Sequence, residues 1–334
     1  MAVTVERLHG DHVEDAARLA AAAYRDLRRA LPILPAAWES PDATAPLIMR
    51  IIDAGPAFAA VERGRLVGYL AGWIGAGRGL RWSFSPEWAN AAAGDDPRLV
   101  REALYSAIAG EWLDAGAPRH LVSTMATAAE AIETWSWLGF GVDTVDAIRD
   151  LSPTVMPERS QDPPPDSAAP TALAARMHVR RAGVDDVAAV ARLERGLRDH
   201  LAAPPVLFAL GPARTNADHE RLLADPAIAT FVAEASGTGA VAYLRIGPVA
   251  DDVAAAVRDP STAAISGAFT IESRRRGGVA TALLDAALAW ARSEGRERCS
   301  VDFESRNVLA RRFWLRWFRP AVLTVGRSVD RPAT

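Results

Sequence analysis

Three consecutive arginines, Arg274 to Arg276, stand directly before a glycine pair, Gly277 and Gly278. Apolar residues then recur at helical spacing, which predicts a helix starting after the glycines. These residues are Leu283, Leu284, Ala287, Leu288 and Ala291. A helix N-terminus presents unpaired backbone N–H groups and a partial positive charge, and glycine lets an anion approach them. The arginines add charge-assisted donors, so the pattern predicts a phosphate or pyrophosphate site.

The elements around this loop must hold it in place. Residues 265–271 are apolar and β-prone and predict a strand that leads into the arginines. Gly295 is suited to end the helix that follows. The order strand, anion loop, helix is what an anion-binding helix N-terminus requires.

Two sequence blocks carry a family resemblance. Residues 275–280, Arg-Arg-Gly-Gly-Val-Ala, resemble the R-x-x-G-x-A pyrophosphate loop of the GNAT superfamily of acyl-CoA N-acyltransferases. Asn307, Ala310, Phe313-Trp314 and Phe318-Arg319-Pro320 are similar to the family's later N-x-x-A-x-x-F-Y-x-x-x-G-F-x-P block. The resemblance covers residues 177–330 well and the preceding half only in outline. A tandem arrangement of this kind is similar to that of mycothiol synthase-like actinobacterial enzymes.

The resemblance implies acetyl-CoA (coenzyme A) as co-substrate, with no metal. It implies that Phe269, Thr270 and Ile271 align the pantetheine, and that Asn307 contacts the same arm. It assigns the pyrophosphate to Arg275, Arg276, Gly277, Gly278, Val279, Ala280 and Thr281. Two departures concern the proton donor: Trp314 stands where the family often has a tyrosine, and the glycine before Phe318 is absent. An indole cannot serve as that acid.

Transfer to an amine needs a base, because an alkylammonium with a pKa near ~10.4 must first lose a proton. We rank Glu272 and Glu304 first as catalytic carboxylates, ahead of Glu234 and Asp302. Strand alternation puts Asp302 and Glu304 on one face. Each of these carboxylates can also be a solvated or ion-paired side chain. Tyr243 is a further candidate acid, although a strand tyrosine often only packs.

The two halves of the chain resemble each other in order. Val5 to Leu19 matches Val179 to Leu193, and Tyr69-Leu70 matches Tyr243-Leu244 at the same offset. Ala131 and Trp135 match Ala310 and Trp314 near each end. Each half predicts strand, helix, hairpin, strand, helix, strand, helix, strand, which is a mixed α/β arrangement. We therefore expect two tandem GNAT-like domains, each with a mixed central sheet flanked by helices.

The expected boundaries are a degenerate GNAT-like domain at residues 1–150, a Pro-rich linker at 151–176 and an acyl-CoA-binding domain at 177–334. In the N-terminal half, Asp95 and Asp96 stand where the phosphate would lie, and no glycine pair is present. Like charge repels phosphate, so we expect that half not to bind coenzyme A.

Composition narrows the class of protein. A net charge of -3 gives no general attraction to nucleic acid or to an anionic membrane, and a single cysteine, Cys299, forms no internal disulfide. No signal peptide or membrane span is predicted, so we expect a cytoplasmic protein. His178, His200 and His219 are too scattered to predict a metal site.

The function predicted from these patterns is an N-acetyltransferase that moves an acetyl (acyl) group from acetyl-CoA to a primary amine of a small-molecule acceptor. A non-catalytic acyl-CoA-binding sensor remains an alternative, which the tryptophan at 314 favours. A dinucleotide site is disfavoured, because Gly277-Gly278 does not give G-x-G-x-x-G. The sequence leaves the acceptor open, and also whether two copies form a homodimer.

Overall fold

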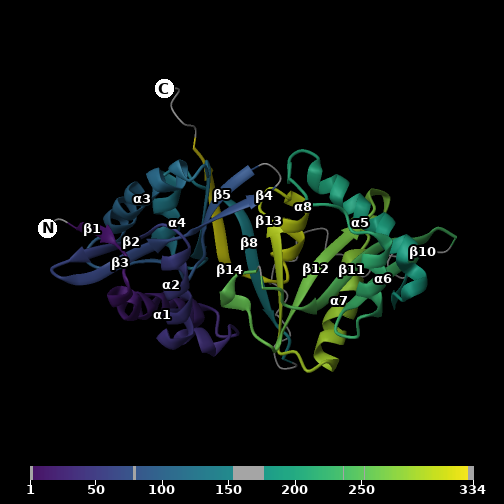
Figure 1. Ribbon diagram of the computed structural model, residues 1–334. Helices are drawn as coiled ribbons and strands as arrows, with labels where there is room; N and C mark the ends of the chain where they lie inside the picture. The colour runs from purple at the N-terminus through teal and green to yellow at the C-terminus, as the bar shows by residue number, and fades with distance from the viewer. Residues whose placement is uncertain (1–2, 78–79, 153–176, 236, 252, 330–334) are drawn as a thin grey trace.

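The computed structural model describes residues 3–77, 80–152, 177–235, 237–251 and 253–329 (Figure 1). From residue 153 on, the segment predicted as a linker lies outside the described residues. We call the chain before that segment the N-terminal half and the chain after it the C-terminal half. Both combine strands and helices, and this confirms the predicted mixed α/β class.

The N-terminal half begins with a strand and a long helix, as predicted. Its strands are β1 (Thr4–Arg7), β2 (Ala57–Glu62), β3 (Arg65–Ala71), β4 (Trp73–Gly77), β5 (Leu80–Ser85), β6 (Asn90–Ala92), β7 (Arg119–Met125) and β8 (Gly141–Asp150). Its helices are α1 (Val13–Ala30), α2 (Pro41–Ala54), α3 (Pro97–Asp114) and α4 (Ala129–Trp137), with 3-10 turns η1 (Gly10–His12) and η2 (Ala36–Glu39).

The C-terminal half follows the same order. Its strands are β9 (Met177–Arg181), β10 (Ala229–Ala235), β11 (Gly239–Pro248), β12 (Thr262–Thr270), β13 (Arg298–Glu304) and β14 (Arg319–Ser328). Its helices are α5 (Val187–Ala202), α6 (Asn216–Ala224), α7 (Val279–Ser293) and α8 (Val308–Trp314), with 3-10 turns η4 (Val184–Asp186), η5 (Ala255–Val257) and η6 (Glu272–Arg274).

The sheets of the two halves are not separate. One ten-stranded sheet has the order β4-β5-β7-β14-β8-β13-β12-β11-β10-β9, and a four-stranded sheet has the order β1-β2-β3-β6. The expectation of one central sheet per half is therefore wrong. The N-terminal half divides its strands between two sheets, and the break falls at Gly72, between β3 and β4.

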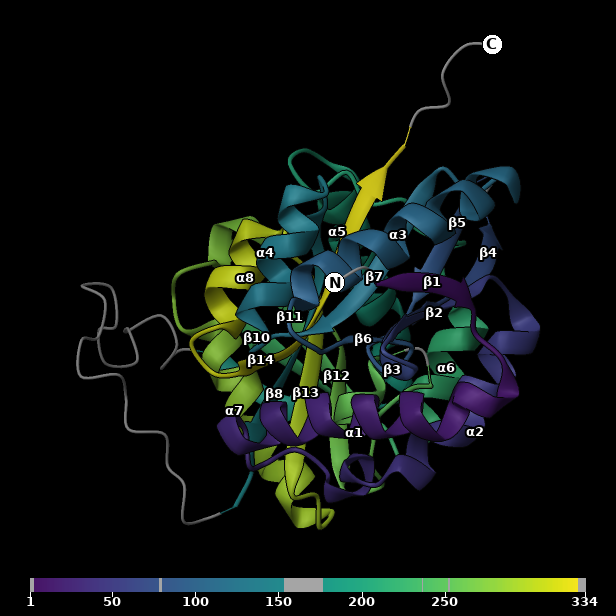
Figure 2. The ribbon, with the colours of Figure 1, turned by 90° about the vertical axis from the view of Figure 1, so that its left-hand side faces the viewer.

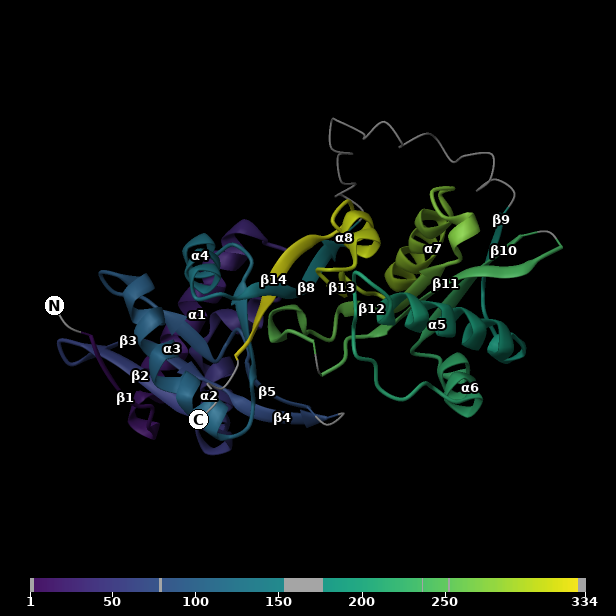
Figure 3. The ribbon, with the colours of Figure 1, turned by 90° about the horizontal axis from the view of Figure 1, so that it is seen from above.

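The last strands of the two halves are exchanged. Strand β8 lies between β13 and β14, and β14 lies between β7 and β8. Each half therefore places its own last strand against the other half, as Figure 3 shows at the junction. Ala147 of β8, which is fully buried, pairs with Val301 on one side and Pro320 on the other.

Helices cover both faces of the sheets. In the N-terminal half, α1 and α3 lie on opposite faces of the four-stranded sheet (Figure 2). In the C-terminal half, α7 packs on one face of β9 to β12 and α5 packs on the other face of β11 and β12. The predicted apolar face of α7 is buried as a unit: Leu283, Leu284, Ala287, Leu288 and Ala291. Gly295, with φ 72°, follows the end of this helix as predicted.

Candidate functional site

The arginine–glycine loop adopts a backbone suited to an anion. Arg276 has φ 61° and Gly278 has φ 77°, and α7 begins at Val279, directly after Gly278. A non-glycine residue with positive φ is strained by roughly 1 kcal/mol or more, and such residues cluster at functional sites. The left-handed turns direct successive N–H groups to one side, as in anion-binding nests. The residues present therefore fit a diphosphate.

Arg275 does not extend toward the helix N-terminus. Its Nε donates to the carbonyl oxygen of Thr270 at 3.1 Å, and its guanidinium lies 5.7 Å from the ring centroid of Phe269. Arg276 is exposed and Arg274 is half-buried. Arg275 thus covers the end of β12, whereas Arg276 has the freedom to meet a phosphate.

Strands β12 and β13 separate beside this loop. They pair in parallel only from Thr262 and Arg298 to Ile265 and Val301, although β12 runs on to Thr270 and β13 to Glu304. A bulge at Ser266 marks the separation, because Ile246 pairs with Ile265 and Arg245 pairs with Gly267. The gap leaves one edge of residues 266–270 unpaired with β13, as an extended amide ligand would require.

Asn307 lies at the end of this gap with its side-chain oxygen engaged. Oδ1 accepts the N–H of Ala310 at 3.2 Å, which caps α8, and lies 3.2 Å from Nε2 of His200. His200 comes from α5, so this contact joins the two sides of the gap. A pantetheine contact from Asn307 would therefore use its amide nitrogen. His200 was missed as a site residue, because no local signal in the sequence shows that the last turn of α5 lies beside Asn307.

Glu304 is the better placed of the two predicted catalytic carboxylates. It ends β13, is half-buried, and pairs in register with Thr144 of β8. Burial raises the pKa of Glu304, and nearby Asp143 raises it further against the charge of Arg306. Glu272 lies on η6 and is exposed to solvent. The structure thus places Glu304 beside the gap between β12 and β13, in an environment that favours a proton acceptor with an elevated pKa.

The other candidate acids and bases lie at different distances from the gap between β12 and β13. Asp302 is exposed on the same face of β13 as Glu304, as alternation predicts, and pairs in register with Asp146. Glu234 lies on β10, two strands from β12, and its ion pair with Arg180 measures 2.6 Å. Tyr243 is 1 % exposed, and burial raises its pKa. Glu234 and Tyr243 are therefore structural in this arrangement.

Behind β12 lies a buried charge cluster that the sequence did not reveal. Glu194 of α5 accepts from Arg214 at 2.7 Å and from the fully buried Arg245 at 3.1 Å. Burial alone would raise the pKa of Glu194, but the hydrogen bond from Arg214 and both positive charges outweigh it and lower the pKa. The cluster fixes α5 on the sheet beside the bulge at Ser266.

Trp314, at the family's tyrosine position, belongs to the core. It is 6 % exposed and makes edge contacts with Phe313 and Phe318, at centroid distances of 4.8 and 5.7 Å. It has no role as a proton donor there. Any acid for the leaving thiolate must come from water or from another group.

The equivalent positions of the N-terminal half are closed. Asp96 caps α3 by accepting the N–H of Leu99 at 3.1 Å, so the protein's own carboxylate takes the place of an anion. Asn90 bridges the end of β5 and β7, donating to the carbonyl oxygens of Pro86 and Ser123. Strands β7 and β13 have equal lengths, and Met125 ends β7 where Glu304 ends β13.

A comparison with known protein families gives a match over the part of the chain that contains this site. Residues 196–318 match the acetyltransferase (GNAT) family. No curated protein sequence matches the chain. The match spans α5 to the turn before β14, and therefore includes the loop, the gap and Glu304.

Solved structures extend the likeness of fold to the whole chain. A GCN5-related N-acetyltransferase from Sphaerobacter thermophilus has a TM-score of 0.56 at 14% identity, covering 99% of this chain and 97% of that one. A GCN5-related glucosamine N-acetyltransferase region of a fungal multi-domain GH3 beta-N-acetylglucosaminidase has a TM-score of 0.52 at 12% identity, covering 97% of this chain and 38% of that one. The match to the GNAT family covers residues 196–318, and over the whole chain the likeness to these structures is one of fold, with two GNAT-like domains in tandem.

Two other kinds of feature, a metal cluster and a membrane-spanning helix, are absent from the described residues. No three His, Cys, Asp or Glu side chains converge there as metal ligands would. Within the same residues, no helix is both long and apolar enough to span a membrane.

Proposed function

We propose that the C-terminal half transfers an acetyl group from acetyl-CoA to a primary amine of a small molecule. The observation that carries this is the separation of β12 from β13 directly before a left-handed turn at a helix N-terminus. A strand edge without a partner suits the amides of pantetheine, and the N-terminus of α7 suits the diphosphate.

Each part of the proposed site has its own role in binding or proton transfer. The backbone of Phe269 to Ile271 would align pantetheine, and the amides from Gly277 to Thr281, with Arg276, would hold the pyrophosphate. Acetyl-CoA supplies an activated thioester when it is bound. Glu304 would accept the proton of the amine, because it is half-buried beside the gap with a raised pKa. Asp302 adds negative charge on the same face, which favours an approaching ammonium.

Gly278→Glu tests the cofactor site. The new carboxylate would enter the phosphate position at the start of α7, and we expect coenzyme A binding by calorimetry to be lost. The thermal midpoint should fall by only a few degrees, because a non-glycine residue at the φ of 77° costs about 1 kcal/mol. Ser293→Glu adds the same charge at the exposed far end of the same helix, and should leave coenzyme A affinity near wild type. Unchanged affinity in Gly278→Glu would refute the site.

Turnover separates an enzyme from a sensor. Incubation with acetyl-CoA and a panel of primary amines should release free thiol in an amine-dependent manner. Coenzyme A binding with no thiol release for any amine would instead support the non-catalytic alternative, which the buried Trp314 favours.

A further inference from the structure

A small cavity lies in the N-terminal half, at its contact with η5 of the C-terminal half. Its walls include Tyr24 of α1, Trp38 of η2, Glu87 and Trp88 between β5 and β6, Met125 of β7 and Ala256 of η5. Three aromatic side chains and one carboxylate therefore surround a single space. No part of the proposed acetyl transfer uses it.

Glu87 is the unusual member of this wall. Its side chain is only 5 % exposed, and Oε1 accepts the N–H of Ala256 at 2.8 Å. It forms no ion pair within the described part of the chain, and Arg258 acts on it only through its field. A buried carboxylate without a cation is costly unless it is protonated or a cation is supplied from outside. Burial accordingly raises the pKa of Glu87.

The chemistry of the wall selects the ligand. Aromatic rings attract cations through their negative faces, and a buried carboxylate complements an ammonium by charge and hydrogen bond. The space has room for about one water-sized group, so only the head of a ligand would fit. Trp38 and Trp88 are partly exposed, so this side of the wall reaches the solvent, where the rest of the ligand would lie.

The cavity has a counterpart in the repeat. It is bounded by α1, the start of α2 and the end of β7, which correspond in order to α5, α6 and the end of β13 in the C-terminal half. Met125 stands where that half has Glu304, so the N-terminal cavity has no base at the equivalent position. We propose that this cavity is a non-catalytic binding site for the primary ammonium head of a small organic amine.

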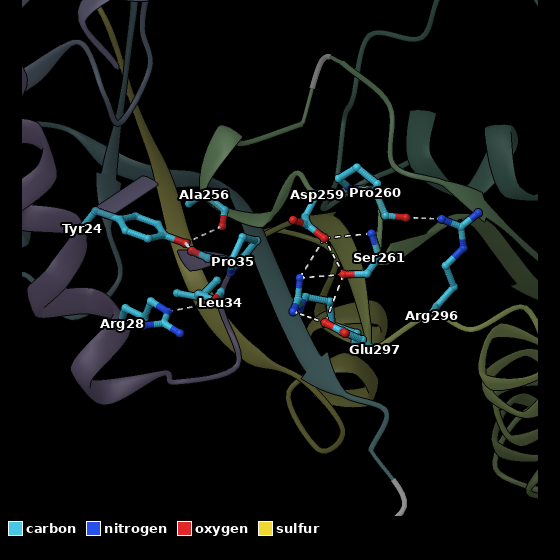
Figure 4. A network of polar contacts seen from close by, with 11 residues as sticks. Tyr24, Arg28, Leu34, Pro35, Ala256, Asp259, Pro260, Ser261, Arg296 and Glu297 are labelled. Atoms are coloured by element: carbon cyan, nitrogen blue, oxygen red, sulfur yellow. Dashed lines mark hydrogen bonds and ion pairs between the residues drawn. The ribbon is translucent and has the colours of Figure 1, made fainter. Parts of the chain in front are cut away.

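The site would also contact the catalytic half. Tyr24 Oη lies 2.7 Å from the carbonyl oxygen of Pro35 and 3.2 Å from that of Ala256 (Figure 4). Because Glu87 accepts the N–H of Ala256, side chains of the N-terminal half contact both backbone polar groups of that residue. The same segment continues into Asp259, whose carboxylate accepts from Arg298 at 2.9 Å and from Ser261, the residue before β12. A bound amine would therefore touch the segment that leads into the cofactor strand.

Calorimetric titration with n-butylammonium chloride, without coenzyme A, tests the proposal, with sodium chloride at equal ionic strength as reference. Binding of so small a ligand is expected near the mM range. Glu87→Gln keeps the shape and the acceptor for Ala256 N–H but removes the charge. We expect it to weaken binding by about tenfold or more. Glu294→Gln, the same change at an exposed carboxylate just after α7, should leave that binding event unchanged.

Two results would overturn the proposal. One is the absence of saturable binding by the folded wild-type protein. The other is binding that Glu87→Gln leaves unchanged, which would place the amine elsewhere. The outcome is independent of acetyl transfer, because the titration contains no acetyl donor. Equal thermal midpoints of wild type and Glu87→Gln would show that the variant is folded.

Discussion

The proposed removal of a proton from the amine depends on the side chain of Glu304. Replacing it with Gln keeps its size but removes the proton acceptor, and general-base catalysis contributes about 10²- to 10⁴-fold. We expect kcat to fall within that range while KM for acetyl-CoA stays near wild type, as measured by thiol release. Glu272→Gln, on the exposed turn η6, should change kcat little. A larger loss in Glu272→Gln than in Glu304→Gln would reverse the assignment.

The pH profile gives a second test of the same residue. A base works only when ionised, and burial raises the pKa of Glu304 above its usual range. As pH falls, kcat/KM should therefore begin to decline at a higher pH than it would for an ordinary carboxyl group. The Glu304→Gln variant should lack this acid limb. An identical limb in both proteins would assign it to another group.

His120 links acidity to stability in the N-terminal half. It is fully buried, Tyr105 Oη lies 2.9 Å from its Nδ1, and burial lowers its pKa from 6.5 to about 4. Below pH 6.5 His120 is protonated in the unfolded chain but stays neutral in the folded protein. The free energy of unfolding therefore falls as pH drops toward 4. The expected loss is on the order of 3 kcal/mol, measurable by urea unfolding from pH 7 to pH 4. The variant His120→Gln should flatten this dependence, and an unchanged slope would contradict the explanation.

At the scale of elements, a protein carboxylate caps the N-terminus of α3, at the position where the C-terminal half has its proposed anion site. Asp96→Ala removes the cap on Leu99 N–H and should cost about 1 kcal/mol of unfolding free energy, as measured by urea denaturation. Coenzyme A stoichiometry should stay at one per chain. Asp95→Ala is the control, because Asp95 has only a 3.8 Å contact with Arg63 on the surface, and its effect should be below about 0.5 kcal/mol. Two coenzyme A molecules bound to Asp96→Ala would mean that the cap alone had closed the site.

The same elements show what local sequence can predict. The α7 helix, its stop at Gly295 and the preceding strand followed from periodicity and glycine, because these signals lie within one stretch of chain. Asp96 was expected only as a carboxylate at the phosphate position, and the structure shows that it caps α3. The side chain of Arg275, which the resemblance assigns to the pyrophosphate, lies against Phe269 instead.

Local sequence signals do not predict contacts between segments that are far apart in the chain. Nothing in residues 141–150 indicates that they pair with β13 and β14, because strand patterns carry no partner identity. The break at Gly72 and the contact between His200 and Asn307 depend on packing across distant segments. The cavity around Glu87 likewise forms only where five separate segments meet.

For the whole molecule, strand exchange predicts that the halves depend on each other. Residues 177–334 alone lack β8 between β13 and β14, and residues 1–152 alone lack β14 between β7 and β8. Co-expression of the two fragments should give a soluble 1:1 complex, detected by co-purification through a tag on one fragment. Each fragment expressed alone should aggregate or self-associate through its exposed strand edges. A stable monomer of residues 177–334 would contradict this expectation.

The exchange also sets the time at which the molecule can fold during synthesis. Strand β14 (Arg319–Ser328) lies beside β7 in the sheet, although it is the last strand of the C-terminal half. During synthesis β7 therefore stays without this neighbour until Arg319 to Ser328 have left the ribosome. Both halves complete the ten-stranded sheet together, although N-terminal domains generally fold first.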